Sequence, residues 1–480
     1  MAAEPISSPA PILRLPPVND ASLHEEISLR ADTVSTRVEV KKVRAVGKKA
    51  LTGKHGRVAI VDGARTPFAK AGTVLKEMDV VDLAGVALAE LVAKTAVDPD
   101  SIDLSIFGVV IPSLAAPNLG REAAFRASLP FTAQGTTVNL ACASGNRAIA
   151  FGAQAILSGE AEVVVAGGAE SLSNVPITFG KSAAEKFMRL SKARGLGQKV
   201  GVAGQFRPAD FAPVAPAIAE YSTGQTMGQS AEKMAKENDI SRRAQDELAL
   251  LSHRRAAVAT AEGRFASQIA PTFPPPRHDQ AVTTDNGVRG DTSYEALSQL
   301  KPVFDRRYGT LTAGNSSPIT DGASAVLLMS EERAKALGYT PLGYLRSWAV
   351  AALDPAGQLL QGPAFAAPAA LDAAGVKLAD LDLIEIHEAF AAQTISTLKA
   401  LASKQFGEEA LGRSGAVGAV DLEKVNVNGG SIAIGHPFGA TGGRVVLQLL
   451  SELGRRGLQL GMVTVCAAGG HGFAMVLERD

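Results

Sequence analysis

The amino-acid sequence predicts an α/β fold with two similar halves, each a mixed sheet covered by helices, and an inserted helical region. Short apolar runs rich in Val and Ile alternate with helical stretches along most of the chain, which is typical of β-α-β units. Segments 138–159 and 425–457 both run from a strand-like start through small residues into a helix, which indicates an internal duplication. Residues 173–302 are more charged, helix-rich and interrupted by prolines, so they predict an insertion between the halves.

Composition favours a folded protein that does not bind nucleic acid. Of the 480 residues, 46% are hydrophobic and 20% are charged, as in ordinary globular proteins, and 48 Lys and Arg balance 48 Asp and Glu. A balanced charge lacks the basic footprint of nucleic-acid binders. The two cysteines cannot form a disulfide framework, which suits a reducing compartment. Because no apolar window could span a membrane and no Cys/His spacing is typical of a metal site, we expect a cytoplasmic protein without a bound metal.

The boundaries of the predicted regions follow changes of pattern along the chain. Residues 1–56 lack the apolar core of a signal peptide and the acid-poor composition of a transit peptide, so we expect a flexible extension. Residues 57–172 with 303–335 form the predicted N-terminal half, 173–302 the insertion and 336–480 the C-terminal half. Residues 79–95 predict a helix, and the expected buried strands with their turns are 102–111, 161–169, 323–329, 381–390 and 462–478.

Cys142 lies between a short apolar run and a long helical stretch. Composition alone favours a buried and unreactive core thiol, the usual state of a free cysteine. The following residues, from Ser144 on, begin a helical pattern, which places Cys142 at or just before a helix N-terminus. The amide groups and dipole there favour a thiolate, so we predict a lowered pKa for this thiol and a place for an oxyanion. Core thiol and nucleophile both remain open on this segment alone.

Three more residues are candidates for chemistry. His436 lies in a glycine-rich run between Gly435 and Pro437, where backbone can approach a ligand closely, and core packing explains such a histidine poorly. His387 ends a predicted strand, and Cys466 ends another before a turn of small residues. Taken singly, these two positions are weak signals, because strand-end histidines and cysteines are common.

The insertion contains a basic stretch, defined here as residues 181–199. It carries six cations and a single acid, Glu185, with Phe187, Met188 and Leu190 among them. A solvated basic helix is the simplest interpretation. The alternative is a surface that meets an anionic lipid or a phosphorylated ligand.

Together these segments resemble the thiolase family, from about Arg57 to the C-terminus. The motifs that carry the resemblance occur in family order: NLACASGNRA, MGQSAEKMAKENDISRRAQDELALLSH, LTAGNSSPITDGASAVLLM, EIHEAFAAQ, NVNGGSIAIGHPFGATGGR and CAAGGHGFAMVLE. The chain departs from the commoner pattern at His387, where most thiolases have Asn, and at Ala468, where most have Gly. His387, CAAGG and the segment APAIAEYSTG look like the β-subunit of the fatty-acid oxidation trifunctional complex.

The resemblance implies a thiolase-like fold of two βαβαβ halves with an inserted loop domain, and it implies a role for each site residue. Cys142 is expected to attack the 3-keto carbon of a 3-ketoacyl-CoA while His436 takes its proton. Cys466 is expected to protonate the departing acetyl-CoA enolate and then to deprotonate CoA. His387 and His436 would hold the oxygen of the acetyl thioester or enolate, and backbone N–H groups of Cys142 and Ala468 the tetrahedral oxyanion.

The implied reaction is thiolytic cleavage of 3-ketoacyl-CoA to acetyl-CoA and a shortened acyl-CoA in fatty-acid β-oxidation. Coenzyme A is then a substrate, Ser317 matches a CoA-contacting position, and no cofactor is bound permanently. The implied assembly is a homodimer or a dimer of dimers, with an enoyl-CoA hydratase/3-hydroxyacyl-CoA dehydrogenase α-subunit as a potential partner and weak peripheral membrane contact through the basic stretch.

Three alternatives stay open on the sequence. One is an acetyl-CoA acetyltransferase that forms acetoacetyl-CoA with the same residues. A second is a condensing enzyme of the ketoacyl-synthase type, against which Cys466 argues, since decarboxylating condensation needs no second acid/base thiol. The third is a non-catalytic acyl-CoA-binding subunit, which four occupied catalytic positions make the weakest.

Overall fold

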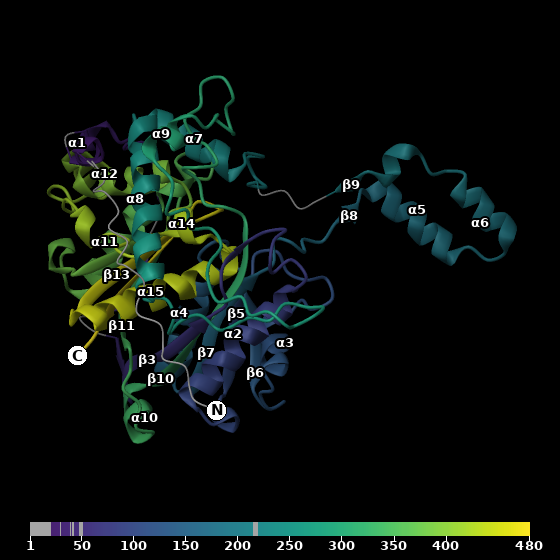
Figure 1. Cartoon of the computed structure of the whole chain (residues 1–480), viewed down its shortest axis with the longest axis horizontal. Helices are drawn as coiled ribbons and strands as arrows, with labels where there is room; N and C mark the ends of the chain where they lie inside the picture. Colours follow the sequence, from purple (N-terminus) through teal and green to yellow (C-terminus); the bar gives the residue numbers. More distant parts are fainter. Residues whose placement is uncertain (1–20, 29, 39, 41–42, 48–50, 215–218) are drawn as a thin grey trace, which may run out of the picture.

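The computed structural model describes residues 21–28, 30–38, 40, 43–47, 51–214 and 219–480. Its centre is one large mixed sheet in the strand order β12-β13-β14-β11-β3-β10-β7-β5-β6, with helices on its faces (Figure 1). Strands β3 (Gly56–Arg65) and β11 (Gly343–Ala352) join the two halves through three antiparallel residue pairs. The predicted α/β class with two similar halves is therefore confirmed.

The N-terminal half has five main strands. β3 and β10 (Thr320–Ser330) are antiparallel, as are β10 and β7 (Val163–Glu170), whereas β5 (Leu104–Gly108) runs parallel to both β7 and β6 (Gln134–Val138). Its helices are α2 (Val80–Thr95), α3 (Leu119–Arg126), α4 (Ser144–Ser158) and α10 (Glu331–Ala336). Short strands β2 (Thr52–Gly53) and β4 (Ala69–Lys70) pair at its margin.

The C-terminal half repeats this connectivity. β11 pairs with β14 (His471–Glu478), β14 with β13 (Leu460–Ala467), both antiparallel, and β13 with β12 (Leu383–Ile386) in parallel. A parallel bridge from Ile384 to Val425 stands where β6 stands in the first half. The helices are α11 (Pro363–Ala374), α12 (Ala391–Ala402), α13 (Lys404–Glu409), α14 (Ser431–Ile434) and α15 (Thr441–Arg456). Helix α15 thus corresponds to α4, as the duplicated segments predicted.

Side chains alternate between the two faces of each half-sheet, and this alternation produces three cores. α2 and α3 cover the outer face of the first half-sheet, and α11 and α12 cover the outer face of the second. Helices α4 and α15 share the middle core with the inner faces of both half-sheets, among them Trp348, which is 1% exposed. The result is five layers, with α4 and α15 as the central layer.

Helices α4 and α15 approach each other closely because both begin with small residues. A Cβ at Gly145 would lie 2.8 Å from the carbonyl oxygen of Gly439, and a Cβ at Gly442 would lie 2.3 Å from the backbone nitrogen of Asn146. Backbone atoms cannot move aside as a flexible side chain can, so only glycine fits at these positions. The starts of the two central helices are therefore held side by side.

The predicted flexible extension is wrong for the part of it that the structure describes beyond residue 20. Helix α1 (Ala21–Ser28) buries Leu23 and Ile27 in the outer core of the second half-sheet, and Val34 follows them. β1 (Arg44–Val46) pairs with β11. The segment packs because Leu23 and Ile27, four residues apart, lie on one face of the helix. A prediction based on composition overlooked this spacing. Residues 1–20 lie outside the described residues.

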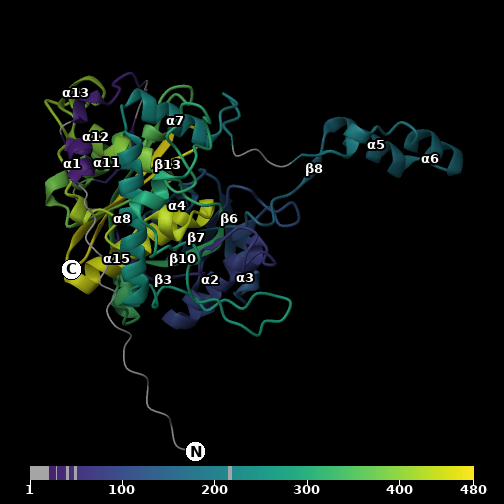
Figure 2. The same ribbon diagram turned by 45° about the horizontal axis from the view of Figure 1, so that its top comes forward.

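The insertion has two parts. One part lies on the body: α7 (Met227–Glu237), α8 (Arg242–Ala261) and α9 (Tyr294–Ser298). The other forms a projecting arm, defined as residues 178–214, with β8 (Thr178–Phe179), α5 (Lys181–Lys192), α6 (Leu196–Ala203) and β9 (Pro213–Val214) (Figures 1 and 2). Among the described residues, no helix is both long and apolar enough to cross a membrane.

We predict that Gly442→Ala lowers both stability and activity. The added methyl group overlaps backbone of α4, and overpacking of this kind costs about 1–3 kcal/mol. Thermal unfolding and initial rates measure the two effects. Gly201→Ala in α6 is the matched control, because its Cβ meets nothing within 4 Å and Ala favours a helix. Equal melting temperatures for the two variants would contradict the close approach of α4 and α15.

Candidate active site

Cys142 lies in the turn between β6 and α4. Helix α4 begins at Ser144 with Ala143 as its N-cap, so the predicted position at a helix N-terminus is confirmed. The preceding Ala141 has a φ of 47°, a left-handed conformation that is unfavourable for a residue other than glycine. Ser144 Oγ fixes this turn by donating to the Ala141 carbonyl (2.6 Å) and accepting from the Leu140 N–H (2.8 Å). The strained turn thus sets the direction of the Cys142 side chain.

The prediction of a lowered thiol pKa at Cys142 is wrong. Desolvation of the thiol, together with a smaller effect of the nearby Glu170, raises its pKa to about 12. Backbone N–H groups of Ala468 and of Cys142 itself act in the opposite direction, but their effect is smaller. Desolvation penalises a thiolate more than the helix start stabilises it, so Cys142 starts as a neutral thiol.

His436 is fixed from both sides by threonines. Its backbone N–H donates to Thr320 Oγ1 (3.0 Å), and its Nδ1 lies 2.6 Å from Thr441 Oγ1, at the start of α15. Gly435 precedes it with a φ of 117°, and a Cβ there would lie 2.8 Å from Thr320 Oγ1. Burial, with the charge of Arg444, lowers the pKa of His436 to about 3, so its imidazole is neutral.

His387 follows strand β12 and meets His436. Its ring centroid lies 4.1 Å from that of His436, and its Nδ1 lies 2.8 Å from Ser431 Oγ. Burial lowers the pKa of His387 well below its ordinary value, helped by His436 and Arg444. The Nε2 atoms of both histidines are buried without a hydrogen-bond partner among the described residues. The Cys142 sulfur and one ring nitrogen of each histidine lie within 4.8 Å of one another.

Cys466 brings a second thiol to the same place. It lies on β13, is 1% exposed, and its pKa is raised well above the ordinary value by burial and by Cys142. The turn after it places the Ala468 N–H against the Cys142 sulfur. Ala468 does not have a positive φ, whereas Gly469 and Gly470 have φ values of 79° and 72°. An alanine is therefore compatible with the turn at 468.

Ser317 lies beside the His387 loop. Its Oγ and its backbone N–H both contact the carbonyl oxygen of Ala389, each at 3.0 Å. These two hydrogen bonds tether the loop between β12 and α12 to the loop before β10. Its role in binding CoA stays a prediction.

Sequence reasoning missed the residues that hold the histidines in place: Glu170, Thr320, Ser431, Thr441 and Arg444. Glu170 accepts hydrogen bonds from three backbone N–H groups, of Val110 (3.0 Å), Ile111 (2.8 Å) and Gly439 (3.0 Å). It thereby ties the end of β7 to the loop that carries His436. A charged residue at the end of an otherwise apolar strand was the one available signal for it.

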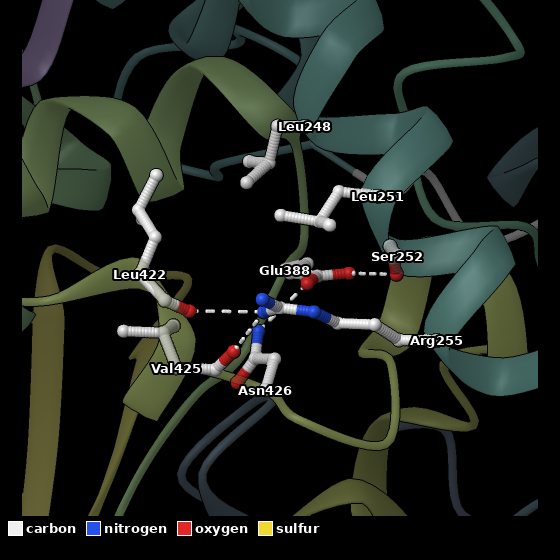
Figure 3. A pocket seen from close by; sticks show the side chains of 8 residues that line it. All are labelled: Leu248, Leu251, Ser252, Arg255, Glu388, Leu422, Val425 and Asn426. Atoms are coloured by element: carbon white, nitrogen blue, oxygen red, sulfur yellow. Dashed lines mark hydrogen bonds between the residues drawn. The ribbon is translucent and has the colours of Figure 1, made fainter. Parts of the chain in front are cut away.

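The Glu388 side chain takes no part in the contacts among Cys142, His387 and His436, although it is next to His387 in the chain. It lines a small pocket with Arg255 and Asn426, and it accepts hydrogen bonds from Ser252 Oγ and Asn426 Nδ2, each at 2.7 Å (Figure 3). Arg255 of the same pocket donates to the carbonyls of Leu422 and Val425. The hydrogen bonds around this pocket therefore connect α8 to the loop that carries His387.

Cys142, His387 and His436 also form a group of three donors that could hold a soft metal ion. The surroundings disfavour an added cation, because the positive charge of Arg444 is buried nearby and because the Cys142 thiol, whose pKa is raised, would have to lose its proton to bind a metal. Proton transfer and hydrogen bonding suit this site better, and the absence of a metal stays a prediction.

We predict that Glu170 makes stability depend on pH. Burial raises the pKa of Glu170 from 4.5 to about 7. A group whose pKa is raised on folding stabilises the protein fully below its unfolded pKa and loses this contribution as pH rises through its folded pKa. Between about pH 5 and about pH 8, the wild type should therefore lose on the order of 3 kcal/mol that Glu170→Gln does not lose.

Urea unfolding at several pH values measures this difference. Glu170→Gln also places an amide against backbone N–H donors, so it should be less stable at every pH, which does not affect the slope. The exposed Glu160 gives the matched control, Glu160→Gln. Parallel pH curves for wild type and Glu170→Gln would refute the buried titration.

Two family matches cover most of the chain. Residues 58–332 match the thiolase N-terminal domain, and residues 339–479 match the thiolase C-terminal domain. The 3-ketoacyl-CoA thiolase of Pectobacterium carotovorum subsp. carotovorum is 50% identical over 428 residues, which are 89% of this chain and 98% of that protein. The 3-ketoacyl-CoA thiolase of Aeromonas salmonicida is 48% identical over 431 residues, 90% of this chain and 99% of that protein.

Solved structures agree with these matches. Human mitochondrial 3-ketoacyl-CoA thiolase in complex with CoA has a TM-score of 0.75 and 32% identity, covering 90% of this chain and 100% of its own. The acetyl-CoA acetyltransferase of Bacillus anthracis has a TM-score of 0.75 and 35% identity, covering 89% and 99%. Fold, duplicated halves and sequence all lead to one assignment: the chain belongs to the thiolase family.

Proposed function

We propose that this protein is a 3-ketoacyl-CoA thiolase, which transfers the acyl group of a 3-ketoacyl-CoA to CoA and releases acetyl-CoA in β-oxidation. One observation carries the proposal: the Cys142 sulfur lies within 4.8 Å of a ring nitrogen from each of two neutral, buried histidines. A thiol beside a neutral imidazole can become a nucleophile at the moment of attack. Relatives about half identical over nearly their whole length are named for this activity.

In the first half-reaction, Cys142 Sγ attacks the C3 carbonyl carbon of the substrate and its proton passes to His436. The tetrahedral oxyanion accepts hydrogen bonds from the N–H groups of Cys142 and Ala468, both of which face the sulfur. Cleavage of the C2–C3 bond leaves the acyl group on Cys142 and the electron pair on the acetyl-CoA enolate. Cys466 gives this enolate a proton, and acetyl-CoA leaves.

In the second half-reaction, the Cys466 thiolate takes the proton of CoA. The CoA sulfur then attacks the acyl group on Cys142, and the proton held by His436 returns to Cys142 as its thiol leaves. Burial raises the pKa of Cys466, which makes its thiolate a strong base once the enolate has been protonated. His387 and His436 serve the oxygen of the acetyl unit, in keeping with their unpartnered Nε2 atoms.

The same residues catalyse the reverse condensation, so formation of acetoacetyl-CoA from acetyl-CoA is the second candidate function. The likeness to the acetyl-CoA acetyltransferase of Bacillus anthracis favours it. A condensing enzyme of the ketoacyl-synthase type needs no Cys466. A non-catalytic subunit needs neither the strained turn before Cys142 nor two neutral histidines beside it.

The proposal includes CoA and acyl-CoA as ligands, Ser317 among the residues near CoA, and no permanently bound cofactor. A cytoplasmic location accords with the bacterial relatives. A homodimer, or a dimer of dimers, is supported by β6, an edge strand that pairs with β5 on one side only in the described part of the sheet. Exposed apolar residues lie in the segments before and after α3, the helix that precedes β6: Leu114 is 76% exposed and Phe131 80%. An α-subunit with hydratase and dehydrogenase activity is proposed from the trifunctional-complex resemblance.

The two thiols should be separable by mutation. Cys142→Ala should abolish both carbon–carbon cleavage and acyl-enzyme formation, because the nucleophile is gone. Cys466→Ala should abolish cleavage but retain slow acylation of Cys142 by a simple acyl-CoA, because that step needs no enolate. Loss of the 3-ketoacyl-CoA enolate absorbance and intact-protein mass spectrometry measure the two reactions.

Two outcomes would overturn the assignment. A stable acyl adduct on Cys142→Ala means that another residue is the nucleophile. Equal loss of both reactions in Cys466→Ala means that this thiol is not the acid and base. Ser158→Ala, at the far end of α4 from the site, is the control for losses of activity that arise during expression and purification.

His387→Asn should retain part of the activity, because Asn occupies this position in most thiolases and can also donate to an oxyanion. His387→Ala should lose on the order of 10²-fold in turnover, the usual cost of one missing donor. Steady-state kinetics of the two variants decide the matter. Equal rates would show that His387 does not act as a donor.

The arm is proposed to make weak, salt-sensitive contact with anionic lipid. Exposed apolar residues lie along it, including Met188 (55%), Leu196 (80%) and Val200 (63%). Lys181 is 91% exposed and makes only a long ion pair with Glu185 (4.0 Å), whereas Lys186 is paired with Asp210 at 2.5 Å and is only 17% exposed. Lys186 therefore helps to hold the arm together and is not available to lipid.

Sedimentation with anionic vesicles tests the arm. Binding at low salt should fall at high salt and in the triple variant Lys181→Glu, Arg189→Glu, Lys192→Glu, since each cation near an anionic surface contributes up to about 1 kcal/mol. Neutral vesicles are the control. Binding that ignores these charge reversals, or no binding at low salt, leaves the arm as solvated surface or subunit contact.

A further inference from the structure

Both histidines of the site direct Nε2 toward it, but the hydroxyl groups that contact their Nδ1 atoms have different hydrogen-bond partners. Each Nε2 is buried and unpartnered among the described residues, and each Nδ1 contacts a hydroxyl group, Ser431 Oγ for His387 and Thr441 Oγ1 for His436. A neutral imidazole carries its proton on one nitrogen only. The other hydrogen-bond partner of each hydroxyl group therefore determines which ring nitrogen carries the imidazole proton.

Ser431 receives a hydrogen bond from an arginine. Arg444 Nη2 donates to Ser431 Oγ at 2.7 Å, and an arginine cannot accept. Among the described residues, His387 Nδ1 is the one acceptor that Ser431 Oγ contacts. If His387 instead donated from Nδ1, the buried serine proton would have no acceptor, which is unfavourable. The Ser431 hydroxyl therefore donates to Nδ1, and His387 carries its proton on Nε2.

Apart from its histidine, Thr441 Oγ1 contacts a hydrogen-bond acceptor, whereas Ser431 Oγ contacts a donor. Thr441 Oγ1 lies 3.2 Å from the Pro437 carbonyl oxygen, one turn earlier in the chain, and 2.6 Å from His436 Nδ1. If the hydroxyl donates to Pro437, it accepts from Nδ1–H, and both contacts are hydrogen bonds. If the hydroxyl donates to Nδ1, the contact with Pro437 is lost. The first arrangement makes one more bond and leaves His436 Nε2 with a free lone pair.

We propose that His387 and His436 are opposite neutral tautomers, with Arg444 acting through Ser431 and Thr441 acting with Pro437 as the positioning residues. His387 then presents an N–H to an oxyanion, and His436 presents a lone pair to the Cys142 thiol proton. Arg444 itself is held by Gln448, whose Oε1 lies 3.2 Å from Nη1, and Gln448 Nε2 contacts both oxygens of Glu385. This inference rests on the proposed function only for its kinetic consequences.

Nitrogen NMR on protein labelled in its histidine rings tests the tautomers directly. The signals of His387 and His436 are identified by their loss in His387→Asn and His436→Asn. The wild type should show His387 protonated on Nε2 and His436 protonated on Nδ1. Either ring in the other tautomer overturns the proposal, and the two variants serve only to assign the wild-type signals.

Two substitutions add a kinetic test. Ser431→Ala should give His387 a mixture of tautomers and slow cleavage about tenfold, with a smaller effect on acylation by a simple acyl-CoA. Thr441→Val should do the same for His436 and slow both reactions, because Cys142 loses its base, whereas Thr441→Ser keeps both hydrogen bonds. Unchanged tautomers and rates in Ser431→Ala and Thr441→Val overturn the proposal.

The tautomer proposal and the proposed function can be refuted independently of each other. Correct tautomers in a protein with no thiolase activity would refute the proposed function alone. Full thiolase activity with the wrong tautomers would refute this inference alone. Thermal unfolding of each variant identifies a rate loss that comes from a damaged fold.

Discussion

The close approach of α4 and α15 is the constraint on which the rest of the structure depends. Glycines at the starts of these helices let backbone meet backbone, and no side chain fits between them. Because Cys142 lies in the turn before α4 and His436 in the loop before α15, the contact between the helices also sets the distance between these two side chains. The five layers bury this contact in the middle core, where neither helix can shift without disturbing both half-sheets.

Burial then determines the charge state of the site. It raises the pKa of both thiols and lowers the pKa of both imidazoles, so the resting site holds no ion pair of its own. The nearby Arg444 and Glu170 are held by hydrogen bonds to fixed groups. Under the proposed function, this site would develop charge only when the substrate supplies an oxyanion, and the N–H donors would already be in place at that moment.

The sequence predicted the architecture well because it depends on periodic patterns. Alternating apolar strands, the helix after Cys142 and the repeat of that segment around His436 all follow from local spacing. The prediction of a lowered Cys142 pKa was wrong because burial dominates the pKa. A helix start can be recognised in the sequence, whereas the depth of burial depends on how the layers assemble. Ser431 and Thr441 were missed for a related reason: a hydroxyl's role depends on whether an arginine or a carbonyl lies behind it, and those partners are set by packing.

The two halves differ in how their strands are connected, and this has a consequence for folding. β13 and β14 are joined by the short turn at Ala468–Gly470, whereas β7 and β10, their counterparts, are separated by residues 171–319. Closing a long loop costs more entropy than closing a short one, and non-local pairs form more slowly. We therefore expect the hairpin that carries Cys466 to form early and the sheet of the N-terminal half to be completed late. Cys142 and Cys466 would thus come together only near the end of folding, so a partly folded chain would lack an assembled site.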